Sequence, residues 1–316
     1  MNINDYKNTL HSKIVLITGA GGGIGFETAK CFATMGAKVI ILEVNEEKGI
    51  NAEKTINSMY ENSAEFYKID LADEESILKM KEYVLSKYGC PDIIFNNAAI
   101  LHLGEIGKVS SNEWDNGYLV NFKAPVLLVS CFIDEMKRRN SGTFVFVSSS
   151  GAVAYMGAYE IFKTAQVELS NTLSMELENT NIYSYTISPG LVKTETAMKS
   201  MLFLTTSSIS SISDKLSDGI IIFLIPLLYA AILFSLSPPM GRTLPLMVIS
   251  PVMATSRRTG IPQRAFDIMG AGGFLLSNYQ EELAEYFVRD EDMVIYEGIE
   301  DAIEKAVGEI RGCEEH

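Results

Sequence analysis

The chain has 316 residues, 47% of them hydrophobic, which is long enough for one large domain and a small additional one. Its formal net charge is −14, and no stretch gathers the lysines and arginines that bind a phosphate backbone, so nucleic acid is not an expected partner. The four cysteines and three histidines show no metal-binding spacing, and no metal site is expected.

Residues 14–43 predict the opening of a dinucleotide-binding sheet. An apolar strand over 14–18 enters the turn Gly19-Ala-Gly-Gly-Gly-Ile-Gly25, and a helix over 26–35 and a buried strand over 38–43 follow. Glycines leave the backbone bare for the approach of a pyrophosphate. The amides at the helix N-terminus would stabilise its negative charge.

Glu43 ends the second strand, eighteen positions after Gly25. A carboxylate in this place accepts hydrogen bonds from the adenosine ribose and repels a 2′-phosphate. Val44 and Asn45 follow it, where an arginine would accommodate that phosphate. NAD(H) is therefore expected to be preferred over NADP(H), and the alternative is a solvated glutamate at a strand end.

Buried strands and helices then alternate along the chain. We expect strands over 65–69, 92–95, 142–147 and 183–187, and helices over 74–88, 114–136 and 158–177. This alternation predicts an α/β fold with a Rossmann-type, doubly wound parallel sheet that is covered on both faces. Ligands of such sheets bind at the carboxyl ends of the strands. The residues expected at those ends are Gly19, Glu43, Asp70, Asn96, Ser149 and Pro189.

Tyr159 and Lys163 lie four residues apart, and therefore on one face of the helix expected over 158–177. A tyrosine with a pKa of about 10 is a poor acid–base at neutral pH, and a neighbouring ammonium lowers that pKa toward the working range. The pair follows a strand that ends in the serine run 148–150. Together these residues predict a centre for proton transfer.

A series of motifs occurs in a recognisable order: Thr18-Gly19-x-x-x-Gly23-x-Gly25, Asp70, Asn96-Asn97-Ala98, Asn121, the serine run, Tyr159-x-x-x-Lys163 and Pro189-Gly190. In this order they resemble the short-chain dehydrogenase/reductase family, over residues 13 to about 250. The resemblance implies an NAD(P)(H)-dependent alcohol dehydrogenase or ketoreductase that acts on a small alcohol or carbonyl substrate. It also implies a homo-oligomer.

The resemblance further implies roles for individual residues. Tyr159 would transfer the proton, Lys163 would also hold the nicotinamide ribose, and Asn121 would order a water in the proton relay. A serine would steady the substrate oxygen. Asp70 would hold the adenine, and Thr194 would contact the carboxamide. The other cofactor contacts implied are Thr18, Gly19, Gly23, Ile24, Gly25, Leu71, Asn97, Pro189 and Gly190.

Two positions depart from the family pattern. Ala99 stands where the family has glycine, and we expect this change to be tolerated. Ser149 lies ten residues before Tyr159, which is shorter than the usual family interval. The working hydroxyl could therefore belong to Ser148, Ser149 or Ser150, and Ser149 is favoured.

The segment 219–236 carries no charge and is almost wholly apolar, with Pro226 in its middle. It predicts either a buried helix of the oxidoreductase domain, before a last strand over 241–249, or a membrane segment. The buried helix is favoured. Because segment 1–12 also lacks the apolar core of a signal peptide, a cytoplasmic protein is expected, and membrane association through 219–236 is the alternative.

The chain after residue 259 has a different character. The segment Gly260-Ile-Pro-Gln-Arg-Ala-Phe-Asp-Ile-Met-Gly-Ala-Gly-Gly273 resembles the C-terminal lobe of spore-maturation (CgeB-like) glycosyltransferases, as do a strand over 293–296 and a helix over 299–310. We expect a catalytic domain over 1–250, a linker over 251–259 and a small α/β appendage over 260–316. The acceptor domain of such transferases is missing, so sugar transfer is not expected.

Two other functions stay open at this point. One is a glycosyltransferase-related protein in which the C-terminal segment carries the function. The other is a non-catalytic Rossmann module that only binds a nucleotide. Asn121, Tyr159 and Lys163 argue against both, because a protein that only binds needs no proton relay.

Overall fold

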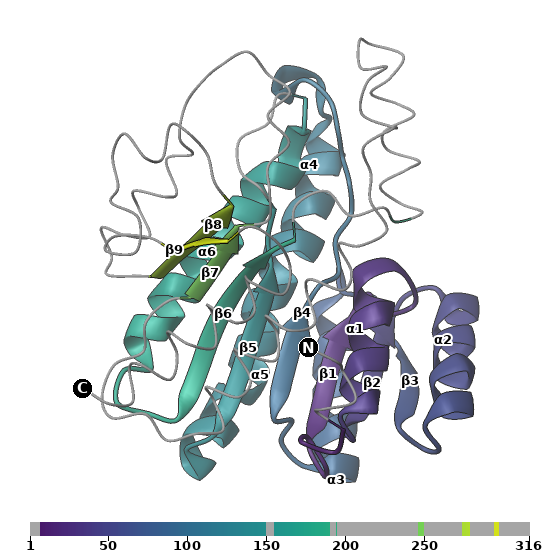
Figure 1. Ribbon diagram of the computed structural model, residues 1–316. Coiled ribbons are helices and arrows are strands. Elements are labelled where there is room, and N and C mark those ends of the chain that lie inside the picture. The colour runs from purple at the N-terminus through teal and green to yellow at the C-terminus, as the bar shows by residue number, and fades with distance from the viewer. Residues whose placement is uncertain are drawn as a thin grey trace.

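The computed structural model describes residues 7–149, 155–189 and 194, together with three strands further along the chain. Its centre is one nine-stranded parallel sheet with the strand order β3-β2-β1-β4-β5-β6-β7-β8-β9 (Figure 1). The predicted Rossmann-type doubly wound sheet is confirmed. The strands are β1 (Ile14–Thr18), β2 (Lys38–Glu43), β3 (Ala64–Lys68), β4 (Ile93–Asn96), β5 (Gly142–Val147), β6 (Ile182–Ser188), β7 (Leu246–Ile249), β8 (Phe274–Asn278) and β9 (Val294–Tyr296).

Helices cover both faces of this sheet in the described part of the chain (Figure 1). Successive strand residues point to opposite faces, so Val15 and Ile17 pack under α1 and α2, whereas Leu16 packs toward α3, α5 and α6. The helices are α1 (Gly23–Thr34), α2 (Glu46–Met59), α3 (Glu74–Tyr88), α4 (Ser111–Tyr118), α5 (Ala124–Arg139) and α6 (Gly157–Glu176).

Most predicted strands and helices of the first 189 residues agree with the structure to within two residues, and three helices differ more. α1 begins at Gly23, three residues before the predicted start, because glycines of low helix propensity form its first turn. α2 has no counterpart among the predicted helices. Its buried face consists only of Gly49, Ala52 and Ile56, too narrow an apolar stripe to stand out in the sequence.

The helix predicted over 114–136 is longer than expected and is interrupted. It starts at Ser111 behind a capping box between Ser110 and Glu113, and it continues past residue 136 to Arg139. Between α4 and α5 lies a π-helical turn, η3 (Leu119–Lys123). Pro125 follows this turn and lacks the N–H that a regular α-helix requires there.

The three strands near the C-terminus extend the same sheet. β7 pairs in parallel with β6, β8 with β7, and β9 with β8. The strands predicted within 241–249 and 293–296 are thus present as β7 and β9. The linker 251–259 and the helix predicted over 299–310 lie outside the described residues.

The segment 219–236, for which a buried helix and a membrane segment were the two interpretations, also lies outside the described residues. Among the helices that the structure does describe, none combines the length and the apolar character needed to span a bilayer.

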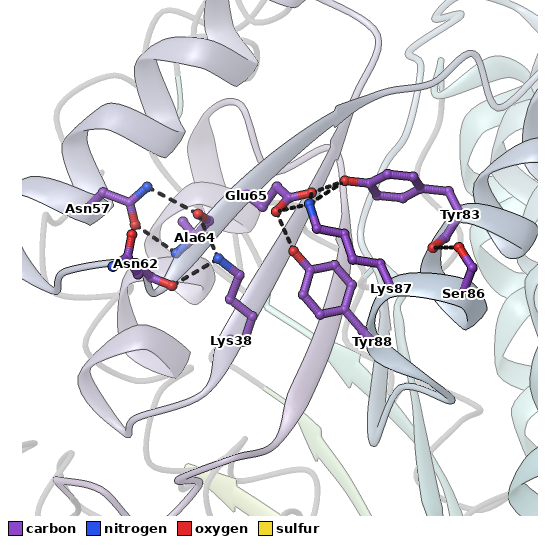
Figure 2. A network of polar contacts seen from close by, with 9 residues as sticks. All are labelled: Lys38, Asn57, Asn62, Ala64, Glu65, Tyr83, Ser86, Lys87 and Tyr88. Carbon is purple, nitrogen blue, oxygen red and sulfur yellow. Dashed lines mark hydrogen bonds and ion pairs between the residues drawn. The ribbon is translucent and has the colours of Figure 1, made fainter.

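A polar network connects β3, the outermost strand on one side of the sheet, to α3 (Figure 2). Glu65 accepts hydrogen bonds from the phenol groups of Tyr83 and Tyr88, and Nζ of Lys87 lies 2.6 Å from Glu65 Oε1. Burial would raise the pKa of the Glu65 carboxyl, but the hydrogen bonds from Lys87, Tyr83 and Tyr88 outweigh burial and lower this pKa to about 2. The network therefore requires an ionised Glu65.

Replacing Glu65 by glutamine should lower the free energy of unfolding at neutral pH by about 1–3 kcal/mol, because a charged acceptor of three donors is lost. A carboxyl whose pKa is depressed in the folded state stabilises the protein above its unfolded pKa, and this contribution disappears as the pH falls. The difference between wild type and Glu65→Gln should therefore shrink from about pH 5 to about pH 3. Urea unfolding across this range measures it.

Glu61→Gln is the matched control, since it removes an exposed carboxylate from the turn just before β3. Its unfolding free energy should follow that of the wild type at every pH. A Glu65→Gln effect that stayed constant with pH would contradict the predicted role of the charge.

Candidate active site

The parallel register brings the carboxyl ends of the strands to one edge of the sheet, as predicted. Thr18 at the end of β1 pairs with Leu42 of β2, and Asn96 of β4 pairs with Phe146 of β5. The loops that leave these strands carry the glycine turn, Glu43 and the serine run. The candidate site is built at this edge.

The glycine turn after β1 packs tightly at Gly19 and Gly25, and it is open at Gly22, just before α1 starts. A Cβ on Gly19 would lie 2.9 Å from Cα of Ala98, and a Cβ on Gly25 would lie 2.5 Å from the Gly19 carbonyl oxygen. Gly22, the N-cap of α1, would meet no atom within 4 Å. The turn thus presents bare backbone and helix N-terminal amides to open space, an arrangement suited to a phosphate group.

Thr18 and Asn97 hold this turn against the loop that follows β4. Thr18 Oγ1 accepts hydrogen bonds from the backbone amides of Asn97 and Ala98, both at 3.0 Å. Asn97 Nδ2 donates to the carbonyls of Thr18 at 3.0 Å and Gly19 at 3.2 Å. Ala99 is exposed and does not have a positive φ, so its backbone does not need the glycine of the family pattern.

Glu43 turns its carboxylate back toward the glycine turn. Oε2 accepts a hydrogen bond from the Gly21 amide at 3.1 Å, and Oε1 accepts from the amides of Val44 and Asn45, each at 3.0 Å. Three backbone donors therefore fix a negative charge beside the turn. This is a defined position rather than that of a freely solvated strand-end side chain.

The other predicted cofactor residues lie around the same edge. Asp70 is exposed and accepts a hydrogen bond from the Ala72 amide at 2.9 Å, while Leu71 packs against the apolar core. Ile24 packs against the core beneath α1. The Cγ2 atom of Thr194 lies 3.3 Å from the position of a Cβ on Gly23. Pro189 is buried at the end of β6, and Gly190 lies outside the described residues.

α6 places Tyr159 and Lys163 on one face, as predicted. Lys163 is only 1% exposed, and its Nζ donates a hydrogen bond to the Val147 carbonyl at 2.7 Å. Burial lowers the pKa of Lys163 to about 7, and the nearby charge of Glu160 opposes this change. The hydrogen bond to Val147 directs the Lys163 side chain to the end of β5.

In the protein alone, Tyr159 does not have the lowered pKa that the sequence argument predicted. Burial and the charge of Glu160 raise the pKa of Tyr159 to about 12, and a hydrogen bond with the Ser149 side chain opposes them. The phenol is thus protonated at neutral pH. Sequence reasoning missed Glu160, a buried acid whose only signal is its place directly after Tyr159.

The structure separates the two serines of the run that it describes. Ser149 shares a hydrogen bond with the Tyr159 side chain. Ser148 is buried, and its Oγ donates to the backbone carbonyl of Lys163 at 2.6 Å. Ser150 lies outside the described residues. Ser149 is therefore joined to the tyrosine, whereas the Ser148 hydroxyl anchors the helix.

The start of α6 rests on the loop that follows β4. The Gly104 amide donates to the Tyr155 carbonyl at 2.8 Å, and a Cβ on Gly157 would lie 2.2 Å from the His102 carbonyl oxygen. Gly157 also has a φ of +53°, which favours glycine. This close approach fixes where the helix that carries Tyr159 begins.

Asn121 is fully buried within the π turn η3. Its Oδ1 accepts from the Ile100 amide and its Nδ2 donates to the Ile100 carbonyl, both at 2.9 Å. Its own carbonyl accepts a hydrogen bond from the side-chain amide of Gln166 on α6. Sequence reasoning missed Gln166, although it lies one helical turn after Lys163. In the described part of the chain, no histidine, cysteine and carboxylate side chains gather into a metal site.

Comparison with known proteins gives two family matches. A model described as short chain dehydrogenase matches residues 13–203, and a model described as glycosyl transferase-like matches residues 236–316. An uncharacterised oxidoreductase from Thermotoga maritima is 34% identical over 189 residues, which cover 59% of this chain and 74% of the relative.

Two solved structures share the fold. A metagenomic short-chain oxidoreductase in complex with NADP has a TM-score of 0.56 at 27% identity, covering 64% of this chain and 94% of that one. A 3-ketoacyl-(acyl-carrier-protein) reductase from Brucella melitensis, complexed with NADH, has a TM-score of 0.57 at 28% identity, covering 60% of this chain and 79% of that one.

Proposed function

Because the chain belongs to the short-chain dehydrogenase family, we propose that it is an NAD(H)-dependent alcohol dehydrogenase or ketoreductase for a small alcohol or carbonyl compound. The observation that carries the proposal is the hydrogen bond between Ser149 and Tyr159, one helical turn before the buried Lys163. These groups lie at the sheet edge that also bears the open glycine turn. A module that only binds a nucleotide would need none of them.

The glycine turn suits the dinucleotide of this proposal. Gly22 opens into free space at the N-terminus of α1, and the amides there favour a pyrophosphate. The cofactor would supply the hydride donor or acceptor. The residues proposed to hold it are Thr18, Gly19, Gly23, Ile24, Gly25, Glu43, Asp70, Leu71, Asn97, Lys163, Pro189, Gly190 and Thr194.

The chain's own side chains would manage the proton. Tyr159 keeps its phenol proton at neutral pH and would give it to the oxygen of a carbonyl substrate as negative charge develops there. Ser149 would donate a second hydrogen bond to that oxygen and so orient it. A protonated phenol is the acid that reduction of a ketone or aldehyde requires, and the phenolate that reduction leaves is the base for the reverse reaction.

Glu43 supports a preference for NAD(H). The two solved structures above hold NADP in one case and NADH in the other, so they do not decide between the cofactors. In this chain the Glu43 carboxylate is fixed by three amides next to the glycine turn. A 2′-phosphate brought to this place would meet a negative charge that cannot easily turn away.

Glu43→Gln should reduce the ratio of kcat/KM for NADH to kcat/KM for NADPH by about tenfold or more, because it removes the charge and keeps the shape. The single glutamine oxygen can keep the bonds from the Val44 and Asn45 amides, while the bond from the Gly21 amide is lost; this loss affects both cofactors and cancels in the ratio. Steady-state rates with both cofactors measure the ratio. Glu47→Gln, an exposed carboxylate in the first turn of α2, is the control and should leave the ratio unchanged.

The proposed activity is tested by NADH absorbance with a panel of small ketones, aldehydes and alcohols. We expect NADH oxidation with at least one carbonyl compound. A lack of turnover with either cofactor in either direction would contradict the proposal. Nucleotide-sugar donors belong in the same panel because of the second family match, and we expect no sugar transfer from them.

A further inference from the structure

The backbone carbonyl of Asn121 lacks its usual helical partner. In an α-helix this carbonyl would accept from the N–H of residue 125, and Pro125 has no N–H. The chain passes this point in the wider π turn η3, in which the Ala124 amide bonds to the Leu119 carbonyl. Such turns often mark functional sites, since they leave backbone groups for other partners.

The side chain of Gln166 takes up this carbonyl. Gln166 lies on α6 and is 0% exposed, and its Nε2 donates to the Asn121 carbonyl. A carbonyl can only accept, so the amide must present its NH₂ to Asn121 and its Oε1 elsewhere. Oε1 is buried and has no hydrogen-bond partner among the described residues. A buried acceptor of this kind calls for a donor.

Lys163 is the nearest donor-rich group along the same helix. It lies three residues before Gln166, which places both side chains on one face of α6, and it too is fully buried. Its ammonium has three N–H groups, and the Val147 carbonyl accepts one of them. Two N–H groups therefore remain for other acceptors.

Among the described residues, Glu160 is the charged side chain whose charge raises the pKa of Lys163. The neutral phenol of Tyr159 lies on the same helix. From the π turn packed against α6, Lys123 is instead paired with Glu74 of α3. β5 presents the Val147 carbonyl, and the two residues after this strand present the hydroxyls of Ser148 and Ser149.

We propose that Gln166 is a positioning residue of the proton-transfer site, which links Asn121 to Lys163. Its NH₂ group holds the Asn121 carbonyl, and its Oε1 accepts a hydrogen bond from one water that in turn accepts from the Lys163 ammonium. In this chain the Gln166 side-chain amide thus donates a hydrogen bond to the Asn121 carbonyl. The family resemblance places an ordered water near Asn121. The inference rests on the proposed function of Tyr159 and Lys163.

The link makes a specific prediction for Gln166→Met, which keeps the side-chain length and removes both amide groups. kcat should fall by about tenfold or more, while KM for NADH should change less than about twofold, since the lysine is misplaced but the glycine turn is untouched. The pH profile of kcat should also shift, because the ammonium has lost an acceptor.

Gln166→Glu separates positioning from packing. A protonated glutamic acid can donate to the Asn121 carbonyl, whereas the ionised form can only accept. Activity of Gln166→Glu should therefore recover toward the wild-type value as the pH is lowered. Ser170→Ala is the control, since Ser170 is buried one turn further along α6 and bonds Ser184 of β6 at 2.9 Å. It should keep the wild-type pH profile.

A second measurement needs no turnover. If Oε1 stabilises the charged form of Lys163, Gln166→Met should destabilise the folded protein more at about pH 6 than at about pH 9, where the lysine is neutral in both proteins. Urea unfolding of Gln166→Met and wild type gives this difference. The loss of unfolding free energy that Ser170→Ala causes relative to wild type should be the same at both pH values.

The outcomes distinguish the two proposals. A wild-type protein without turnover would defeat the proposed function, and the unfolding measurements would then decide alone on Gln166. Equal destabilisation by Gln166→Met at both pH values would overturn the link to Lys163. So would a Gln166→Glu variant whose activity follows the wild-type pH profile.

Discussion

Tyr159→Phe should abolish turnover, with a loss in kcat of about 10³-fold or more, while binding of NADH stays nearly unchanged. The ring remains in place, but the group that gives its proton to the substrate oxygen is gone, and general acid catalysis contributes about 10²–10⁴-fold in enzymes. kcat from NADH absorbance and Kd from NADH fluorescence measure the two effects separately.

Tyr155→Phe is the matched control for this variant. Tyr155 is a tyrosine four residues earlier, is 59% exposed and uses its backbone carbonyl to hold Gly104. Removing its hydroxyl should leave kcat unchanged. A Tyr159→Phe variant within about tenfold of the wild-type rate would remove Tyr159 from the mechanism.

Ser149→Ala should slow catalysis by about 10²-fold or more, because the substrate oxygen loses a donor as its charge develops. It should also weaken the hold on the Tyr159 phenol, with which Ser149 shares a hydrogen bond. Single-turnover rates of Ser149→Ala and wild type measure the loss.

Ser148→Ala is the comparison that tests the register of the serine run. Its Oγ anchors the Lys163 carbonyl, so this variant should lose stability and much less activity. The assignment would move to the neighbouring serine if Ser148→Ala or Ser150→Ala were slower than Ser149→Ala.

The regular part of the fold could be predicted from local patterns. Buried apolar runs that alternate with amphipathic helices predicted the strands β1 to β6 and the parallel sheet, because a strand covered on both faces is hydrophobic along its length. The glycine turn and the carboxyl-end residues followed from the same pattern. α2 is the exception, because small side chains such as Gly49 and Ala52 bury a helix without forming a strong apolar stripe.

The tertiary structure decided which strands follow β6 in the sheet. The sequence predicted a small appendage after residue 260 and did not indicate how its strands pair: β8 pairs with β7, and β9 with β8. All three strands β7, β8 and β9 lie within the glycosyl transferase-like match. Strand pairing is a long-range interaction, and the local residue pattern of a strand does not indicate which strand will lie beside it in the sheet.

At the candidate site, the sequence by itself determined the spacing of Tyr159 and Lys163 on one helix face, since helical periodicity needs only local information. The tertiary structure decided what surrounds them. Burial raises the pKa of Tyr159 and lowers that of Lys163, Ser149 rather than Ser148 meets the phenol, and Gln166 reaches the Asn121 carbonyl that Pro125 leaves without its usual donor. Desolvation and contacts between distant segments exist only after the chain has packed, so a residue pattern does not contain them.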